Sequence, residues 1–289
     1  MSELSKEEIQ KYYNHNDLPK ISNPIKYFFR CFAKIIAFIV FGGGAVILAI
    51  FAFPFIRLFS KKKGEDFGID ARAYVSKTFR RFLGILQLVH TSMLVVQDRN
   101  EFLEVKGKVV IANHPSLLDF VYLMSLMPNS TCIVRGGLIK TPLGGVIRQA
   151  YITNTTEFDD VLVECKKLIE KGCNVIIFPE GTRSPRHGQN NYKKGAARIA
   201  LYANCDVQPF FIGGSDKFGL GKHDPLWSFN PIEKYTYNII KLPVISISEF
   251  AGESESLAAK HLTKRMEEVI RSAGEEHSKS PLTKTLNNY

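Results

Sequence analysis

Cysteine is scarce in this sequence and follows no regular spacing. The five thiols are odd in number and contain no C-x-x-C pair: Cys31, Cys132, Cys165, Cys173 and Cys205. Disulfide frameworks and zinc sites need paired or regularly spaced ligands. No ligand spacing is visible among the histidines either, which include His90, His187, His223 and His261. The sequence therefore argues against a disulfide framework and a metal site, and it favours a reducing compartment.

Acidic residues are also in short supply. The 289 residues hold 38 Lys and Arg against 28 Asp and Glu, a formal net charge of +10. Such an excess favours an anionic partner: nucleic acid, acidic lipid or a phosphorylated substrate. Residues 1–63 hold ten Lys or Arg against four Asp or Glu, and these surround the most apolar stretch of the chain. Nucleic-acid binders interleave basic and aromatic residues on a folded surface, so this layout favours a membrane surface over nucleic acid.

The apolar stretch itself, residues 35–56, carries no charge. A helix of that length reaches across a bilayer core of ~30 Å at ~1.5 Å per residue. Three glycines, Gly42 to Gly44, weaken a helix at its centre, and Pro54 predicts a break at its far end. Basic residues on both sides leave the orientation undetermined, so a full crossing and a bent segment within one leaflet both stay open. We assign residues 1–63 to a polar lead-in and a membrane-anchoring segment.

Residues 67–90 have the pattern of an amphipathic helix. Phe79, Phe82 and Leu83 share one stripe with Leu86, and basic residues lie at its edges. A Phe/Leu face beside basic residues is typical of a helix at a membrane interface. The same stripe is equally suited to packing on the protein core, so both interpretations stay open.

From about residue 100, short apolar runs alternate with helical patterns. The strand-like runs lie at 108–113, 131–137, 151–154, 173–178, 207–214 and 235–244, and the helical patterns at 116–127, 141–149, 157–171, 195–203 and 253–273. This alternation predicts an α/β fold with a largely parallel central sheet flanked by helices. We assign residues 64–250 to this domain, including the helix at 67–90, and residues 251–289 to a C-terminal amphipathic helix and tail.

The stretch NHPSLLD, residues 113–119, follows the first strand-like run of this domain. Ser116 and Asp119 have the spacing of a capping box, which predicts that Ser116 caps a helix and Asp119 lies in its first turn. From there a carboxylate can pair with one nitrogen of His114 and leave the other free to take a proton from an alcohol. Ser116 is the alternative nucleophile, although a cap would use its hydroxyl on the backbone. Alone, this spacing is weak evidence for catalysis.

The stretch NVIIFPEGTRS, residues 174–184, is a buried strand pattern followed by a polar loop. Gly181 permits a tight turn, and Thr182 and Arg183 offer donors that suit a phosphate. Arg186, Lys193 and Lys194 add positive charge beyond the loop. A solvated loop with Arg183 in a surface ion pair is the structural alternative.

Together, H-x-x-x-x-D after one strand and F-P-E-G-T-R-S after a later one resemble the glycerolipid acyltransferase family, which includes the 1-acylglycerol-3-phosphate acyltransferases. The resemblance covers roughly residues 75–245. It implies that His114 is the general base and Asp119 its orienting partner, and that Glu180, Gly181, Thr182 and Arg183 shape the acceptor site. It also implies that residues 206–214 match a later strand beside the substrate cleft, and that the hydroxyl attacks an acyl thioester directly.

The resemblance further implies the partners of the protein. These are membrane lipids, a lyso-glycerolipid acceptor, and an acyl carrier protein or coenzyme A as carrier of the acyl donor, with no further cofactor and no nucleic acid. The expected location is the inner membrane of the cell, with the active site on the cytoplasmic face. The expected reaction joins the fatty acyl group to the free hydroxyl of 1-acylglycerol-3-phosphate.

One departure from the family pattern leaves the acceptor open. The second block of the family usually reads G-x-I-F-I-D-R, and its Arg helps to bind the acceptor phosphate. Here AYITN, residues 150–154, places Thr153 and Asn154 where Asp and Arg are expected, and Arg148 is out of register. Either Arg183 with Arg186, Lys193 or Lys194 holds the phosphate, or the acceptor is another lyso-lipid or a glycolipid. Two further alternatives stay open beside this departure: a thioester or lipid hydrolase, and a lipid-binding protein without activity.

Overall fold

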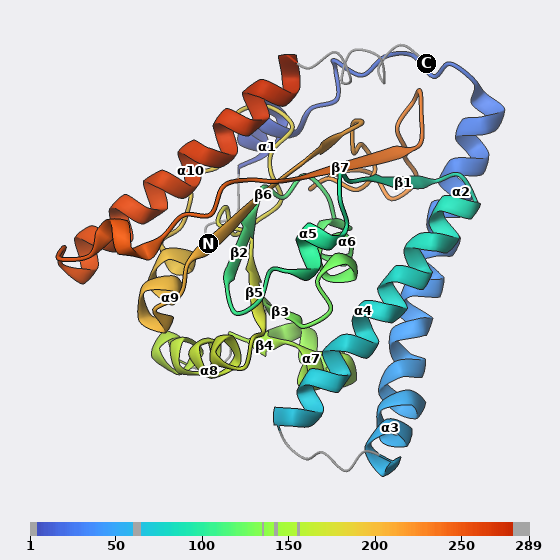
Figure 1. Ribbon diagram of the computed structural model, residues 1–289. Helices are drawn as coiled ribbons and strands as arrows, with labels where there is room; N and C mark the ends of the chain where they lie inside the picture. Colours follow the sequence, from blue (N-terminus) through green and yellow to red (C-terminus); the bar gives the residue numbers. More distant parts are fainter. Residues whose placement is uncertain (1–4, 60–64, 135, 142–143, 155–156, 280–289) are drawn as a thin grey trace.

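Seven strands form one central sheet in the order β1-β7-β6-β2-β5-β3-β4 (Figure 1). The computed structural model describes residues 5–59, 65–134, 136–141, 144–154 and 157–279. The strands are β1 (Ser92–Val95), β2 (Val109–Ala112), β3 (Ser130–Val134), β4 (Ile152–Thr153), β5 (Asn174–Ile177), β6 (Val207–Gly214) and β7 (Tyr235–Lys241). Neighbouring strands are parallel except for β6 and β7, which are antiparallel. The predicted α/β fold with a largely parallel sheet is confirmed.

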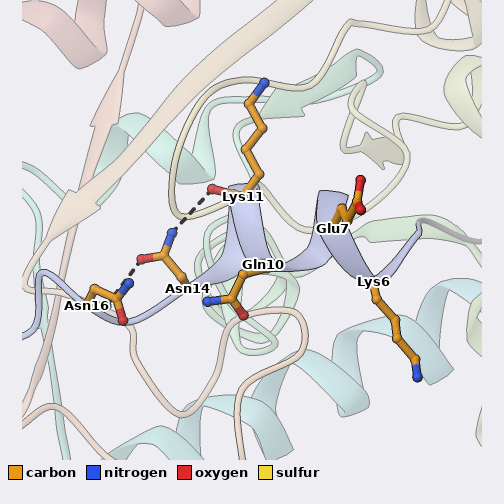
Figure 2. A pocket seen from close by; sticks show the side chains of 6 residues that line it. All are labelled: Lys6, Glu7, Gln10, Lys11, Asn14 and Asn16. Carbon is orange, nitrogen blue, oxygen red and sulfur yellow. Dashed lines mark hydrogen bonds between the residues drawn. The ribbon is translucent and has the colours of Figure 1, made fainter.

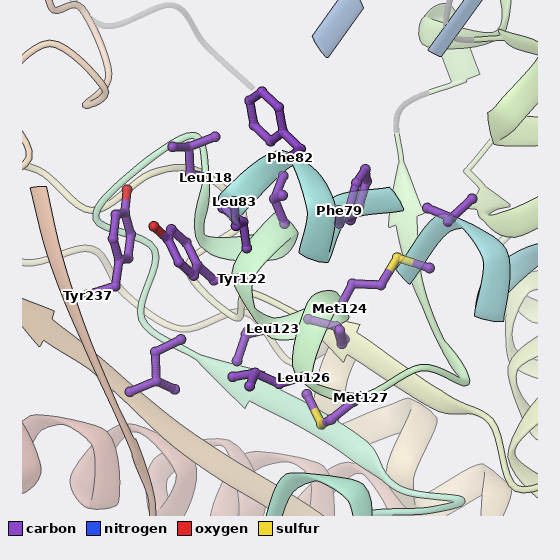
Figure 3. Packing of buried hydrophobic residues seen from close by; sticks show 14 of the residues in the cluster. Phe79, Phe82, Leu83, Leu118, Tyr122, Leu123, Met124, Leu126, Met127 and Tyr237 are labelled. Atoms are coloured by element: carbon purple, nitrogen blue, oxygen red, sulfur yellow. The ribbon is translucent and has the colours of Figure 1, made fainter. Parts of the chain in front are cut away.

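Each face of the sheet is covered by helices because successive strand residues point to opposite sides. Val109 and Ile111 of β2 belong to one hydrophobic cluster, together with residues of α8 (Phe158–Glu170), α9 (Gly195–Ala203) and α10 (Glu255–Lys279). Val110 and Ala112 belong to the other cluster, together with residues of α4 (Glu65–Leu88) and α6 (Asp119–Leu126). Figure 3 shows the second cluster, in which the Phe and Leu residues of α4 meet the Leu and Met residues of α6.

The apolar segment forms one continuous helical run. It comprises α2 (Pro24–Ile47), a π-helical turn (Leu48–Ala52) and α3 (Phe53–Phe59). By length and composition Pro24–Leu58 is able to cross a membrane, with a mean hydropathy of 2.7 and only 6% of its most apolar window buried. The predicted break at Pro54 is wrong. The π-helical turn directly before it shifts the hydrogen-bonding pattern, and a proline in the first turn of the next segment needs no N–H partner.

The continuous run also contradicts a segment that bends back within residues 35–56. The chain reverses later, between α3 and α4, and the basic run predicted to flank the segment there, Lys61 to Lys63, lies outside the described residues. Figure 1 shows α4 returning alongside α2 and α3 at one flank of the sheet. Phe41 of α2 stacks on Phe79 with ring centroids 5.8 Å apart, and it also contacts Phe82 at 5.3 Å.

The predicted helix at 67–90 is confirmed as α4. Its Phe/Leu stripe is not exposed for contact with a membrane interface. Phe79, Phe82, Leu83 and Leu86 are all buried within the protein. Packing on the core, the second of the two interpretations, is therefore what the structure shows for this stripe. The reason is that α6 and α2 both present apolar side chains to the same face of α4.

The remaining elements frame the sheet. Helix α7 (Gly144–Ala150) follows β3, while α1 (Lys6–Tyr13), α5 (Asn100–Leu103) and the edge strand β1 were not predicted from the sequence. Strands β2 and β5 are direct parallel neighbours, with Ile111 beside Ile177, and β6 lies on the other side of β2, with Phe210 beside Ala112. The residues that follow β2 and β5 therefore emerge at the same edge of the sheet, where sites of open α/β sheets form.

Candidate active site

His114 and Asp119 lie within hydrogen-bonding distance at the carboxyl end of β2. The strand ends at Ala112, and α6 begins at Asp119, so the intervening turn folds the carboxylate back onto the imidazole. The distance between His114 Nδ1 and Asp119 Oδ2 is 2.8 Å. Because a carboxylate accepts, Nδ1 carries the hydrogen in the neutral ring and Nε2 is left as the basic nitrogen. Nε2 has no hydrogen-bond partner among the residues that the structure describes.

The Asp119 carboxylate is completely buried and is held by three donors. Oδ2 accepts from the Ser116 N–H at 2.7 Å as well as from His114, and Oδ1 accepts from the Ser116 hydroxyl at 2.5 Å. The single hydroxyl proton of Ser116 is thus used on the carboxylate. The Tyr237 hydroxyl, 2.7 Å from Ser116 Oγ, must therefore donate to it. Tyr237, on β7, extends the hydrogen-bonded group behind His114, which the sequence did not predict.

The predicted role of Ser116 as N-cap needs a correction. The sequence predicted a helix from residue 116 onward. Helix α6 instead begins at Asp119, and Leu118 is its N-cap. One half of the capping box is present, since the Asp119 side chain accepts from the Ser116 N–H. The Ser116 hydroxyl accepts from the Leu118 N–H at 3.2 Å but is otherwise used on Asp119 and Tyr237. Because Ser116 is fully buried and its oxygen is saturated, it is not available as a nucleophile.

The loop after β5 holds His114 from the other side. The imidazole stacks on the Phe178 ring with centroids 3.9 Å apart and 14° between the planes. The backbone N–H of His114 donates to Ser184 Oγ at 3.1 Å and to Glu180 Oε1 at 3.3 Å, and its carbonyl accepts from the Ser184 N–H at 2.7 Å. Ser184 Oγ in turn donates to Glu180 Oε1 at 2.5 Å. The F-P-E-G-T-R-S loop therefore holds the His114 backbone directly.

Glu180 is buried, and its second oxygen accepts from Asn190 Nδ2 at 2.8 Å. Gly181 has a positive φ of 68°, and a Cβ at this position would lie 2.6 Å from Lys193 Nζ. The turn that brings Glu180 and Ser184 together therefore requires glycine at this position. Thr182 is half-buried beside it. Glu180 thus shapes the site by accepting hydrogen bonds from the neighbouring backbone and side chains.

Arg183 reaches across to the connection between β6 and β7. Its Nη1 donates to the Leu220 carbonyl at 2.9 Å and to the Gly221 carbonyl at 2.6 Å. Burial lowers the pKa of this guanidinium, and the charges of Asp224, Asp119 and Tyr13 partly counteract that effect. A surface ion pair, the structural alternative for Arg183, is not what the structure shows. One of its two terminal nitrogens is engaged with backbone, which fixes the direction of the remaining donors.

The other cations considered for a phosphate are differently placed. Arg186 is enclosed by two carboxylates, Asp17 at 2.9 and 3.0 Å and Asp216 at 2.7 Å. These ion pairs neutralise its charge, so Arg186 is poorly suited to hold a substrate phosphate. Lys194 is the N-cap of α9, as the sequence predicted for the start of that helix.

The N-terminal helix α1 and the segment after it cover this part of the molecule. His15 Nε2 lies 2.9 Å from Asp224 Oδ1, and Asp224 Oδ2 accepts from the Gly219 and Gly221 N–H groups at 2.7 Å each. His187 donates its backbone N–H to the Tyr12 carbonyl at 3.0 Å. The N-terminal segment thus contacts both loops that position Arg183, the loop after β5 and the connection between β6 and β7. No short sequence pattern predicts this contact, because it joins residues 169 to 209 positions apart.

Two cavities flank the loop after β5. One of about 310 Å³ opens beside Pro115 and is lined by Tyr13, Ser184 and the glycines at the end of β6. The other, of about 290 Å³, lies between Asn113, Glu180 and the C-terminal part of α10. Ser184 and Pro185 line both, so the two cavities are neighbours beside the loop that is hydrogen-bonded to the His114 backbone.

A further hollow of about 500 Å³ lies on the exposed side of α1 (Figure 2). Its lining is Lys6, Glu7, Gln10, Lys11, Asn14 and Asn16. Asn14 and Asn16 are linked to this helix end by the two hydrogen bonds drawn in the figure. The hollow contains neither the dyad nor the F-P-E-G-T-R loop, so it is not the candidate active site. Among the described residues, no cluster of His, Cys, Asp and Glu is arranged to hold a metal ion.

The segment that departs from the family pattern has a structural role. Thr153 ends the short strand β4, and the Asn154 side chain accepts from the Gly136 N–H at 2.9 Å. The position at which an Arg was expected thus stabilises a neighbouring turn. It adds no cation to the site.

The chain is similar to known acyltransferases. A family model described as Acyltransferase matches residues 94–213, a range that includes both the dyad and the F-P-E-G-T-R loop. A chloroplastic 1-acyl-sn-glycerol-3-phosphate acyltransferase of Arabidopsis thaliana is 28% identical over 178 residues, which are 60% of this chain and 48% of that protein. A 1-acyl-sn-glycerol-3-phosphate acyltransferase of Helicobacter pylori is 28% identical over 142 residues, which are 45% of this chain and 54% of that protein. The chain spans about half the length of the curated relatives it matches.

A solved structure has the same fold. It is the crystal structure of the 1-acyl-sn-glycerophosphate (LPA) acyltransferase PlsC from Thermotoga maritima, with a TM-score of 0.61. The match covers 86% of this chain and 98% of that chain at 24% sequence identity. It therefore extends the similarity from residues 94–213 to most of the elements described above.

Proposed function

Because the chain belongs to the glycerolipid acyltransferase family, we propose that it is a membrane-bound O-acyltransferase. It transfers a fatty acyl group from an acyl thioester to the free hydroxyl of a lyso-glycerolipid. The proposed acceptor is 1-acylglycerol-3-phosphate. The names of the relatives support this acceptor, and the pairing of His114 with Asp119 supports the chemistry.

The proposed reaction rests on the unpaired Nε2 of His114. This nitrogen takes the proton from the acceptor hydroxyl as its oxygen attacks the thioester carbonyl carbon. A C–O bond forms, the C–S bond breaks, and the leaving thiolate takes the proton from the imidazolium. Asp119 keeps the ring in the required tautomer and stabilises its cationic form between these steps. The products are the diacylated lipid and the free thiol of the carrier, so no covalent acyl-enzyme and no further cofactor are needed.

The donor is proposed to be carried by coenzyme A or an acyl carrier protein. The formal charge of +10 supports the approach of an anionic carrier, since opposite charge accelerates encounter. The two cavities that are both lined by Ser184 support separate entry of donor and acceptor.

The membrane location is part of the proposal. The run Pro24–Leu58 exposes apolar side chains along its length, including Ile39, Phe51 and Leu58. An acceptor that is itself a membrane lipid would then reach the dyad without leaving the bilayer, while the donor approaches from the cytosol. We place the active site on the cytoplasmic face of the inner membrane on these grounds.

A second acceptor class is favoured by one observation. Asn154 stands where the family has an Arg and is engaged with the Gly136 backbone, so phosphate binding relies on fewer cations here. A lyso-lipid or glycolipid with a different head group would fit the same mechanism.

The test is an acyl-transfer assay with purified protein in detergent or vesicles. Labelled acyl-coenzyme A and acyl carrier protein are each offered with a panel of lyso-lipids of different head group. Lysophosphatidic acid should give the highest turnover, and a different acceptor would support the second class. Thioester loss that is equal with and without acceptor would establish a hydrolase. Absence of both activities with both carriers would overturn the proposal.

A further inference from the structure

The connection between β6 and β7 exposes two large apolar side chains to solvent. Leu226 is 67% exposed and Trp227 is 49% exposed. The residues that follow, Ser228 and Phe229, are buried, so the loop is anchored on one side and apolar on the other. Exposed Trp and Leu at the tip of an anchored loop cost solvation free energy, because about 25 cal/mol is lost per Å² of apolar surface left in water.

The anchor of this loop is helix α2. Lys34 Nζ donates to the Gly219 carbonyl at 3.0 Å and to the Ser228 carbonyl. Arg30 Nη1 donates to the Ile232 carbonyl at 3.0 Å, and Tyr27 Oη accepts from the Phe229 N–H at 3.3 Å. Three successive turns of α2 therefore hold the loop. Its tip has a fixed position relative to the helix that is able to cross a membrane.

The exposed tip is continuous with the exposed face at the start of α2. The Trp227 ring lies 5.6 Å from the Phe28 ring, and Phe28 lies 5.9 Å from Phe29 in an edge-to-face arrangement. Ile25, Phe28 and Phe29 are each more than half exposed. These five side chains, Ile25, Phe28, Phe29, Leu226 and Trp227, form what we call the aromatic edge.

The chemistry of this edge fits a lipid surface. Tryptophan prefers the boundary between head groups and acyl chains, where its ring is apolar and its N–H stays hydrated. Lys20 and Lys26 are exposed on the residues that lead into and begin α2, where they suit anionic head groups. The apolar face also continues along the same helix through Phe32, Ile36 and Ile39. A bilayer covers such a surface without a gap.

We propose that the aromatic edge is a second membrane contact, made by the β6–β7 connection beside α2, and that it sits at the head-group level of the bilayer. The inference rests on the membrane location proposed above and adds the loop to it. The same connection supplies the Leu220 and Gly221 carbonyls that hold Arg183. Contact of its tip with lipid therefore fixes the height of Arg183 and its loop relative to the membrane surface.

The chain contains one tryptophan, so its intrinsic emission reports on Trp227 alone. The full-length protein is mixed with vesicles of anionic and zwitterionic phospholipid, and binding is measured separately by flotation. Vesicles carrying bromine near the glycerol end of the acyl chains should quench about half or more of the emission, because the ring lies at the boundary region. Bromine near the terminal methyl should quench less, and a water-soluble quencher should lose access on binding.

The matched control moves the tryptophan to the other flank. Trp227→Phe combined with Tyr202→Trp places a single indole on α9, which lies on the flank opposite α2 (Figure 1). Tyr202 is 46% exposed, close to the value for Trp227. This variant should float with the vesicles but show no quenching by brominated lipid.

The outcomes separate the two proposals. Flotation with quenching of Trp227 alone supports the aromatic edge. Flotation without quenching of Trp227 overturns the inference and leaves the membrane location standing. Failure to float overturns the membrane location itself, whereas the acyl-transfer assay in detergent still tests the chemistry. Shielding of Trp227 in lipid-free solution that rises with self-association would identify a second copy of the chain as the occupant instead.

Discussion

The unpaired nitrogen of His114 carries the proposed proton transfer, so removal of this side chain tests the chemistry directly. His114→Ala should lower turnover by about 10²- to 10⁴-fold, the usual contribution of a general base. The ring is partly exposed and its backbone is held by Glu180 and Ser184, so the fold should survive. Turnover is measured by acyl transfer, with vesicle flotation and thermal unfolding as controls. Unchanged activity in a folded variant would remove the dyad from the mechanism.

A second prediction at this scale concerns the hydroxyl of Tyr237. Tyr237→Phe removes the donor to Ser116 and so weakens the hydrogen bond from Ser116 to the Asp119 carboxylate. We expect turnover to fall by up to about fivefold, since a hydrogen bond contributes about 1 kcal/mol and 1.36 kcal/mol corresponds to about tenfold in rate. Turnover is measured by acyl transfer, with thermal unfolding as the control for stability.

Tyr235 on the same strand provides the matched control. Its hydroxyl is also buried, but it donates to the Phe218 carbonyl at 2.7 Å and has no hydrogen bond to the group behind His114. Tyr235→Phe should therefore cost a similar amount of stability without lowering turnover. Equal turnover of the two variants would reduce the role of Tyr237 to packing, in which its ring stacks on Tyr122 with centroids 4.0 Å apart (Figure 3).

At the scale of elements, sequence patterns predicted the helices and strands whose bounds are set by short-range interactions. Helix α9 and strand β6 have the predicted bounds, because an apolar period over eight or nine residues specifies them without help from distant parts. Edge strand β1 was missed because its four residues become a strand only by pairing with β7, far away in the chain. The motifs placed His114, Asp119 and Glu180 correctly at one edge. Tyr237, Asp224 and helix α1 reach the same place only through tertiary contacts, which no short spacing reveals.

The link between α2 and the β6–β7 connection yields a prediction about stability. Lys34→Met keeps the aliphatic stem but leaves the Gly219 and Ser228 carbonyls without this donor. Because buried polar groups without partners are costly, the variant should lose about 1–3 kcal/mol of unfolding free energy. Activity should fall as well, since the same connection holds Arg183. The measurement is thermal unfolding in detergent together with acyl transfer.

Lys26→Met is the control for this variant. It makes the same chemical change on the same helix, at a position that is exposed rather than buried. Its unfolding temperature and turnover in detergent should match those of the unchanged chain. If both lysine variants behave alike, the hydrogen bonds from Lys34 do not support the loop.

At the scale of the whole molecule, the sheet and the helical run have separate roles: the sheet assembles the candidate site, and the helical run presents an apolar surface. The parallel pairing of β2 with β5 brings the two motifs to one edge, and α2 with the β6–β7 connection links that edge to the most apolar surface of the protein. The two hydrophobic clusters keep these parts in one folded body, since α4 packs on α6 and α2 at once. The site is therefore oriented by the same elements that present the apolar run.

This arrangement predicts how salt affects membrane binding. The net charge of +10 should accelerate association with anionic vesicles at low ionic strength, since the Debye length is about 10 Å at 0.1 M salt. Once bound, the protein is held by apolar burial of Pro24–Leu58, which salt does not weaken. Flotation after a high-salt wash should recover the protein with the vesicles, whereas the rate of initial binding should fall steeply with added salt. Quantitative release by salt would mean that charge alone holds the protein, and that the exposed apolar run does not enter the bilayer.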